Sequence, residues 1–426
     1  MPMKFLRALV CIQLWFAAAG SMLYAQSPAN DTLKISISQA EDQFLKNNLQ
    51  LIAQRYNIDI ASAQIITARL FNNPNFSFSN GIYASEVPNA YHEQTFGLAQ
   101  LFTTAGKRNK NIQLAKINVQ QAQYQFFDLL RTLRYTLRSD FYNIYYQEQS
   151  AQVYTQAIQS LTKTLGAFKE QFAKGNIAEK EVLRIQSELY SLENEYNDLQ
   201  TGIDTTQREF KMLIRATPTA YVVPQYNGDL TGTQLVTAVP YQRLLDSAYA
   251  NRYDLKSART QVDYDNLNLR LQKANAVPDL TFNVGYDRLA AYGNNFLGAG
   301  VSFDLPFFNR NQGNIRQARV NIDQSKTQLQ LQQNQVENDV ATQYKTALRL
   351  EQLANSFDPK FRQDFTRLIQ GVYRNYQMRN ISLLEFLDFY DSYKTNILQS
   401  NNLQYSRLNS LEQLNYVTGT QFFNQQ

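Results

Sequence analysis

Apolar side chains recur at alternating steps of three and four residues on both sides of residue 175. These positions are Ile158, Leu161, Leu165, Phe168 and Phe172 before it, and Val182, Ile185, Leu189, Leu192, Tyr196, Leu199 and Ile203 after it. Such heptad spacing makes neighbouring helices wrap around each other. A helix from about Lys107 to Phe172 would be on the order of 100 Å long. The pattern therefore predicts helical rods that no compact globular domain contains.

Shorter stretches alternate apolar and polar residues, which predicts strands with one apolar face. Their apolar positions are Phe76, Phe78, Ile82 and Phe96 in the first half, and Leu280, Phe282, Val284, Tyr286, Leu297, Ala299, Val301, Phe303 and Leu305 in the second. Taken alone, this pattern fits a half-buried sheet of a soluble protein. Segments of about ten residues with one apolar face also suit the strands of an outer-membrane barrel, where that face meets lipid. Beside such long helices, we favour the barrel.

The sequence repeats once. Residues 73–78, NPNFSF, are echoed 204 positions later by residues 277–282, VPDLTF. Further pairs at this offset are Leu51 with Leu255, Phe172 with Tyr376, Ile177 with Ile381, Glu181 with Glu385 and Leu183 with Leu387. We predict two related units, residues 26–215 and 241–426, joined by a linker or equatorial region at 216–240 that is rich in Pro, Gly and Thr.

Each predicted unit has the same order of elements. A helix comes first, and in unit one Ser38 and Glu41 would form a capping box at its start. A β-hairpin follows at about 74–104 or 278–305, and two very long helices follow the hairpin. The predicted fold class is thus a membrane protein of mixed α and β structure with an internal twofold repeat.

The first 25 residues have the layout of a secretory signal peptide, in which Lys4 and Arg7 precede an apolar run and cleavage follows Ala25. Cys11, the sole cysteine, lies inside this run, whereas lipoprotein signals place a cysteine at its end. We therefore expect neither a lipid anchor nor a disulfide in the mature chain. Loss of the two cations lowers the net charge from +5 to +3. That charge is too small to indicate nucleic acid binding.

Four strands per chain cannot close a barrel, for which about eight are the practical minimum. An open sheet edge cannot stand in lipid, because its backbone groups would lack hydrogen-bond partners. The chain must therefore oligomerise. Two copies would give eight strands and a filled interior, and three copies would give twelve strands with room for a channel. The heptad helices would then form a second, all-helical tube below the barrel.

A strand is expected to become a helix within residues 305–315, LPFFNRNQGNI. Pro306 cannot continue the ladder of hydrogen bonds. The two phenylalanines suit the aromatic girdle at a membrane edge, and Gly313 would permit the unusual backbone of the hinge. Unit one makes the same transition within residues 100–111, with Gly106 as the expected pivot.

These stretches resemble the TolC family of outer-membrane efflux proteins, and within it the CzcC-like branch that serves cation export. The matching segments are RLFNNP at 69–74, QLFTTAGKR at 100–108, LPFFNRNQGNI at 305–315 and ISLLEFLD at 381–388. The resemblance covers essentially all of the mature chain. It implies a homotrimer with a twelve-stranded barrel in the outer-membrane lipid of a Gram-negative bacterium and a long periplasmic helical barrel. It also implies two protein partners, a periplasmic membrane-fusion adaptor and an inner-membrane pump of the RND type.

The turns between the long helices, near residues 175 and 379, form the ends of the two rods. We predict that the adaptor docks on these tips, which consist of Gly175, Asn176 and Ile177 in unit one and of Arg379, Asn380 and Ile381 in unit two. Unit two has arginine where unit one has Gly175, so the two tips need not bind alike.

Two acids after the second turn are candidates for a pore gate. Glu385 and Asp388 are three residues apart on a predicted helix and share a face, a pattern that is also typical of ordinary solvated helix. The TolC family carries acids at the corresponding place, and the resemblance maps them onto these two positions as an acidic ring at the closed end of the channel. Unit one has Glu181 and Arg184 there, so the doubled acid is specific to unit two.

No group of residues indicates enzymatic chemistry. His92 is the only histidine, Met212 and Met378 are the only methionines after the signal peptide, and neither a phosphate-binding loop nor a nucleophile motif occurs. We therefore expect no catalytic residue, no metal site and no cofactor.

We interpret the chain as the passive exit duct of a tripartite efflux pump, with metal cations favoured as cargo by the CzcC-like resemblance alone. A multidrug duct and a type I protein-secretion duct of the same fold are open alternatives. A structural periplasmic coiled-coil protein that never enters a membrane is a third, against which the strands and the hinge argue. Because a wide duct selects little, the sequence does not name the cargo.

Overall fold

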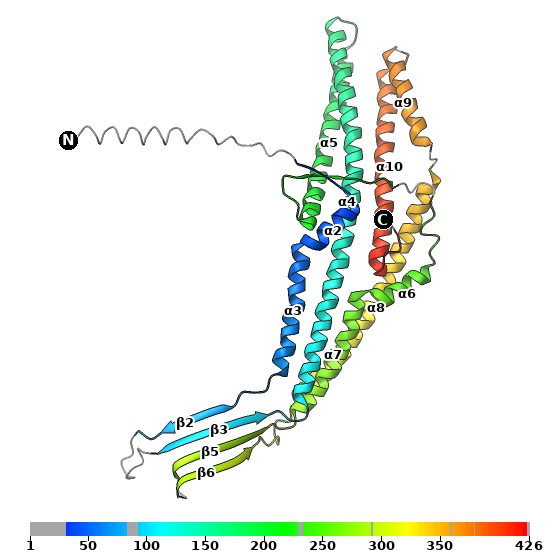
Figure 1. Cartoon of the computed structure of the whole chain (residues 1–426). Helices are drawn as coiled ribbons and strands as arrows, with labels where there is room; N and C mark the ends of the chain where they lie inside the picture. The colour runs from blue at the N-terminus through cyan, green and yellow to red at the C-terminus, as the bar shows by residue number, and fades with distance from the viewer. Residues whose placement is uncertain are drawn as a thin grey trace, which may run out of the picture.

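The chain forms one long molecule with a sheet at one end and two helical hairpins at the other (Figure 1). The computed structural model describes residues 31–82, 93–228, 233–290, 293–357, 360–378 and 380–423. The predicted signal peptide, His92 and Arg379 therefore lie outside the described residues. Between the two ends, helices from both halves of the chain run side by side (Figure 1).

Long helices carry the chain between the sheet and the tips. They are α4 (Lys107–Ala173) and α5 (Glu179–Ile214) in the first half, and α8 (Gln312–Ser356), α9 (Phe361–Gln377) and α10 (Leu383–Thr418) in the second. The 67 residues of α4 form one helix, which confirms the prediction from the apolar spacing. The heptad positions Leu161, Leu165, Ile185 and Leu192 are buried in one core cluster of the hairpins.

The second half differs, because its outgoing helix is interrupted. α8 ends at Ser356, Phe357 has an extended backbone with ψ 136°, and α9 begins at Phe361. The prediction of two uninterrupted helices in this half is therefore wrong. The sequence contains the reason in Pro359, since proline has no backbone N–H to donate and disfavours helical backbone at the preceding residue.

Shorter helices precede the strands of each half: α2 (Ile37–Asn47), α3 (Leu49–Arg69), α6 (Tyr241–Asn251) and α7 (Tyr253–Asn275). The capping box of α2 consists of Ser36 and Gln39, so the predicted pair is wrong by two residues. Ser36 is the residue with extended backbone, and its N–H donates to the Gln39 side chain at 3.0 Å. Glu41 instead forms an ion pair with Arg138 of α4, with an N–O distance of 2.7 Å.

The strands of the two halves join in one antiparallel sheet, in the order β2 (Asn75–Asn80), β3 (Gln94–Phe102), β5 (Leu280–Ala290) and β6 (Gly293–Ser302). The halves meet in the β3–β5 pair, where Leu98 lies opposite Val284. β2 and β6 each have one neighbour, so their outer edges are unpaired within the described part of the chain.

A second sheet of two strands lies in the equatorial region and is absent from the prediction. β1 (Thr32–Ile35) pairs in parallel with β4 (Tyr221–Pro224). β4 falls inside residues 216–240, for which the sequence indicates only a linker. Ile35 and Val222 are buried in a core that also contains Phe141 of α4 and Phe210 of α5. This core fixes the equatorial region to the long helices.

Candidate functional site

One face of the four-stranded sheet is apolar and exposed. Residues paired across neighbouring strands point to the same face, so the register brings together Phe76, Phe78, Phe96, Leu98, Phe282, Val284, Leu297 and Val301, all of them exposed. The ring centroids of Phe78 and Phe96 are 4.9 Å apart. The opposite face is mostly polar or small, with Ser77, Ser79, Thr95, Gly97, Asn283, Gly285, Gly298, Gly300 and Ser302, and it also carries Leu101 and Phe296. Lipid on one side and water on the other favour this division.

Where β3 becomes α4, an ion pair connects the two halves of the chain. Gly106, the residue before α4, has the left-handed backbone φ 65°, ψ 25°. Lys107 Nζ lies 2.7 Å from Asp279 Oδ1, and the Thr104 N–H donates to the same oxygen at 2.8 Å. Burial alone would raise the pKa of Asp279, but the hydrogen bonds from Lys107 and Thr104 outweigh it and lower the pKa. The turn from strand to helix is therefore held by a charged contact.

The second hinge uses Asn311 where the sequence predicts Gly313. Asn311 has φ 57° and precedes α8, and its side-chain amide donates to the backbone carbonyl of Gln272 at 2.7 Å. Gly313 is the second residue of α8 and does not have a positive φ, so its predicted role as pivot is wrong. Asparagine tolerates the left-handed region because its short polar side chain bonds locally. Pro306 lies between the end of β6 and this hinge.

Both predicted docking tips end their helices with the same backbone hydrogen bond. In the first tip the Asn176 N–H donates to the carbonyl of Gln171 at 2.9 Å, and Gly175 has φ 73°. In the second tip the Asn380 N–H donates to the carbonyl of Asn375, also at 2.9 Å. This bond is typical of helices that end in a left-handed residue, for which glycine is favoured.

A cavity of about 620 Å³ lies between the two tips. Residues of both hairpins line it, among them Phe168, Ile177, Glu181, Tyr376 and Ile381. Ile177 and Ile381, which the sequence places in two separate tips, thus face one groove. The structure brings the two tips together as the walls of a shared site.

Stacked aromatic rings connect the hairpins beside this groove. Phe386 of α10 is fully buried, and the ring of Tyr376 of α9 stacks on it with the centroids 4.5 Å apart. Phe168 of α4 stacks on Tyr376 at 6.1 Å. Rings from both halves therefore pack the tips against each other. Only the heptad position of Phe168 hints at this cluster in the sequence.

The two gate candidates have different surroundings. The Glu385 carboxylate accepts hydrogen bonds from the N–H of Ser382 at 2.8 Å and from its hydroxyl at 2.9 Å, which completes a capping box at the start of α10. The backbone bond first, and then the hydroxyl bond, lower the pKa of Glu385. Asp388 is exposed and has no hydrogen-bond or ion-pair partner among the described residues. The Ser-x-x-Glu spacing of residues 382–385 is the sequence signal for this cap.

Buried polar side chains also lie along α4, between the hairpins and the equatorial region. Lys394 of α10 is 6% exposed and lies 3.0 Å from Glu195 of α5, which also accepts from the Tyr154 hydroxyl at 3.1 Å. Burial and the charge of Glu195 raise the pKa of Tyr154 to about 12. Nearer the sheet, burial raises the pKa of Asp140 to about 8, and the charge of Glu209 adds to the effect. None of these groups has a signal in the sequence.

Within the described ranges, no three His, Cys, Asp or Glu side chains are placed to hold a metal ion together. In the same residues, no helix is long and apolar enough to cross a membrane.

Comparison with known families gives one match that covers most of the chain. The family model described as "Outer membrane efflux protein" matches residues 41–214 and 244–420. A curated relative, the cobalt-zinc-cadmium resistance protein CzcC of Cupriavidus metallidurans, is 21% identical over 287 residues. The aligned part is 67% of this chain and 66% of that protein, just under two thirds of its length.

Solved structures share the fold. The CmeC outer membrane channel of Campylobacter jejuni has a TM-score of 0.73 at 17% identity, over 92% of this chain and 87% of that one. The outer membrane protein VceC of Vibrio cholerae has a TM-score of 0.70 at 16% identity, over 91% of this chain and 96% of that one. The arrangement of sheet and long helices is therefore that of outer membrane channels.

Proposed function

The chain belongs to the outer membrane efflux protein family, and on this premise we propose that it is the passive exit duct of a tripartite efflux pump. As a family member it is an outer-membrane protein of a Gram-negative bacterium with a large periplasmic helical part, and it is not an enzyme. One observation carries the proposal: a sheet with one apolar face, whose two outer edges are unpaired within the described ranges, continues into very long helices.

The sheet edges that have no partner among the described residues support a homotrimer. In lipid, each backbone group without a hydrogen bond costs several kcal/mol. Pairing of β6 in one copy with β2 in the next would satisfy both edges, and three copies of the four-stranded sheet would close a barrel of twelve strands. Two copies would give eight strands, whose side chains fill the interior. A duct therefore favours three copies, with the helices forming a tube below the barrel.

The groove between the tips supports docking of a periplasmic membrane-fusion adaptor, which would connect the duct to an inner-membrane RND-type pump. An amphipathic helical hairpin binds through apolar anchors in an apolar groove. Ile177, Tyr376 and Ile381 offer such a lining. The proposed docking residues are those of the two tips, Gly175, Asn176, Ile177, Arg379, Asn380 and Ile381.

Metal cations are the proposed cargo, on the likeness to CzcC, whose name refers to cobalt, zinc and cadmium resistance. In a trimer, Glu385 and Asp388 would place six carboxylates around the periplasmic end of the pore. Carboxylate rings favour cations in channels. A strain without this protein should become more sensitive to cobalt, zinc and cadmium than to an amphipathic drug; the reverse order would contradict this choice of cargo.

Matched lysine substitutions on the two faces of β5 test the duct itself. Val284→Lys puts a cation on the apolar face, at a cost of about 2–4 kcal/mol near the middle of a bilayer. Asn283→Lys puts the same cation on the polar face, one residue away. We expect Val284→Lys to be depleted from the outer membrane, and Asn283→Lys to insert and shift ion selectivity toward anions in planar bilayers.

Two measurements on the parent protein accompany these variants. Native mass spectrometry in detergent should give three copies, and the protein should stay in the membrane during an alkaline wash. A stable monomer or dimer would contradict the trimer. Release by the wash, or equal insertion of both lysine variants, would favour a periplasmic coiled-coil protein instead.

Single cysteines test the docking groove, because the sequence has no cysteine after Cys11. Ile177→Cys and Ile381→Cys should cross-link to the adaptor. Tyr190→Cys, an exposed position farther along α5, serves as the matched control and should not. Cross-linking at Tyr190→Cys without cross-linking at the two groove positions would place the adaptor elsewhere.

A further inference from the structure

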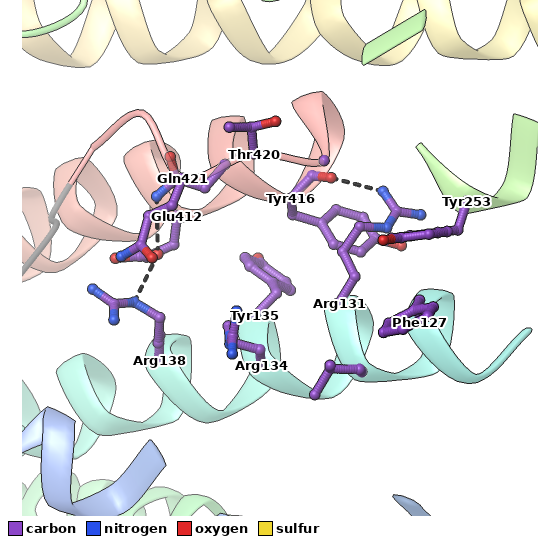
Figure 2. A pocket seen from close by; sticks show the side chains of 13 residues that line it. Phe127, Arg131, Arg134, Tyr135, Arg138, Tyr253, Glu412, Tyr416, Thr420 and Gln421 are labelled. Atoms are coloured by element: carbon purple, nitrogen blue, oxygen red, sulfur yellow. Dashed lines mark hydrogen bonds and ion pairs between the residues drawn. The ribbon is translucent and has the colours of Figure 1, made fainter. Parts of the chain in front are cut away.

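A second cavity lies far from both the tips and the sheet, where α10 ends beside α4 and the start of α7 (Figure 2). Its volume is about 260 Å³. Three arginines of α4 line it, Arg131, Arg134 and Arg138. Four aromatic rings also line it, those of Phe127, Tyr135, Tyr253 and Tyr416, together with the polar residues Glu412, Asn415, Thr420 and Gln421. The cavity thus combines cationic groups with aromatic rings and neutral polar groups.

Two of the three arginines are neutralised by acids of the same chain. Arg131 Nη2 lies 2.6 Å from Asp128 Oδ1, and its Nη1 donates to a backbone carbonyl at 2.7 Å. Arg138 lies 2.7 Å from Glu41 and 2.9 Å from Glu412. The acids at the cavity are therefore already paired, which leaves neither a free carboxylate for a cation nor a free charge on these two arginines.

Arg134 lies between these two along α4 and is different (Figure 2). In the part of the chain that the structure describes, its Nε is buried without a hydrogen-bond partner, and the guanidinium forms no ion pair. A buried donor without an acceptor is unfavourable, and more so when it is charged. A guanidinium presents a planar fork of donors that matches a carboxylate. Among the described residues, the cavity therefore offers one unmatched positive charge.

We propose that this cavity binds a small organic carboxylate, whose carboxylate group pairs with Arg134 and whose apolar body lies among the surrounding aromatic rings. A single negative charge matches the one guanidinium of the cavity that is free among the residues the structure describes, whereas a phosphate would bring more charge than the cavity can balance. The Tyr135 hydroxyl already donates to Asn409 at 3.2 Å, so its ring contributes contact area and not a further donor. Binding at this site does not depend on the exit-duct proposal.

Titration of the full chain in detergent with 4-fluorobenzoate, by calorimetry and fluorine NMR, tests this site. Arg134→Gln should weaken binding by about tenfold or more, because it removes a charge-assisted pair. Arg134→Lys keeps the charge but lacks the planar fork of donors. Its affinity for 4-fluorobenzoate should therefore lie between those of Arg134→Gln and the parent. Arg208→Gln, at an exposed position of α5, is the matched control and should not change binding.

Four results would overturn the proposal. The first is a parent protein that does not bind 4-fluorobenzoate, and the second is equal binding by Arg134→Gln. If Arg134→Gln does not fold, equal affinity of Arg134→Lys and the parent counts in its place. The third is inorganic phosphate that binds as tightly as 4-fluorobenzoate, which would contradict an organic carboxylate. The fourth is a parent that binds no carboxylate together with an Arg134→Gln variant that no longer forms the oligomer. This result would mean that Arg134 forms an ion pair with an acid of a neighbouring copy.

Discussion

Lys107 Nζ lies 2.7 Å from Asp279 Oδ1, although 172 residues separate the two in the sequence. Lys107 is the first residue of α4, and Asp279 directly precedes β5. The pair thus connects the hinge of the first half to the hairpin of the second. Lys107 is only 8% exposed, and a charge at this depth depends on its partner.

Asp279→Asn should lower the free energy of unfolding at neutral pH by about 1–3 kcal/mol, because it leaves the Lys107 ammonium without its counter-charge. The pKa of Asp279 is lowered from 3.8 in the folded protein. Its contribution is therefore complete above about pH 4 and is lost as the pH falls through the folded pKa. Thermal unfolding should show that the melting temperatures of Asp279→Asn and the parent differ at pH 7 and differ less at pH 3. Asp198→Asn, at an exposed site, is the control; a difference that does not change with pH would contradict the ion pair.

Gly106→Val and Gly166→Ala should change stability in opposite directions. Gly106 has φ 65°, where a side chain costs about 1–2 kcal/mol. Gly166 lies inside α4, and a Cβ added there meets nothing within 4 Å, so alanine should stabilise the helix by about 0.5–1 kcal/mol. Denaturant unfolding of the two variants measures both effects. A neutral Gly106→Val would show that the hinge is free to relax.

The two tips should respond oppositely to changes of their helix caps. Ser382 caps α10, whereas Ala178 stands at the start of α5 without a side-chain bond. Ser382→Ala should destabilise the second tip by about 1 kcal/mol, and Ala178→Ser should stabilise the first by a similar amount by forming a box with Glu181. Hydrogen exchange followed by mass spectrometry should show faster exchange at the start of α10 in the first variant and slower exchange at the start of α5 in the second. Unchanged rates at both sites would mean that these caps do not limit opening of the tips.

Asp140→Asn should make the protein more stable at alkaline pH. The pKa of Asp140 is raised from 3.8 to about 8 by burial and by Glu209, so the unfolded chain gives up this proton first. Stability should therefore decline as the pH rises from about 4 to about 8, and the asparagine variant should lack this decline. Melting temperatures between pH 5 and pH 9 measure it. Parallel curves for the variant and the parent would show that Asp140 does not titrate in this range.

If Glu385 and Asp388 line the pore, Asp388→Asn should reduce cation preference more than Glu385→Gln does. The Glu385 carboxylate is held by Ser382, and glutamine at that position keeps the capping box. Asp388 is exposed and can approach its counterparts in other copies, where crowded carboxylates attract a cation. Planar-bilayer recordings of selectivity and of block by trivalent cations provide the measurement. Unchanged selectivity in the double variant would make these acids ordinary solvated surface.

Some features of the candidate site follow from the sequence and others do not. The positions of the tips follow from the ends of the heptad stretches, because a left-handed glycine interrupts the spacing at residue 175. That Ile177 and Ile381 face one groove does not follow, since their separation in sequence says nothing about the distance between two hairpins. At the second hinge, glycine is the residue expected to have a positive φ because it is the most permissive, whereas Asn311 has it in the structure.

The sequence by itself determined the elements whose side-chain period reflects backbone geometry: the 3.6-residue turn of the long helix α4 and the two-residue alternation of the strands. Only the tertiary structure decided the contacts between distant segments. The strand β4 pairs with β1, Arg407 donates to the carbonyl of Thr233 at 2.7 Å, and Glu351 accepts from the N–H of Val236 at 2.8 Å. These contacts join residues more than 100 positions apart, and local periodicity carries no information about them because they form only when the packed helices bring the segments together.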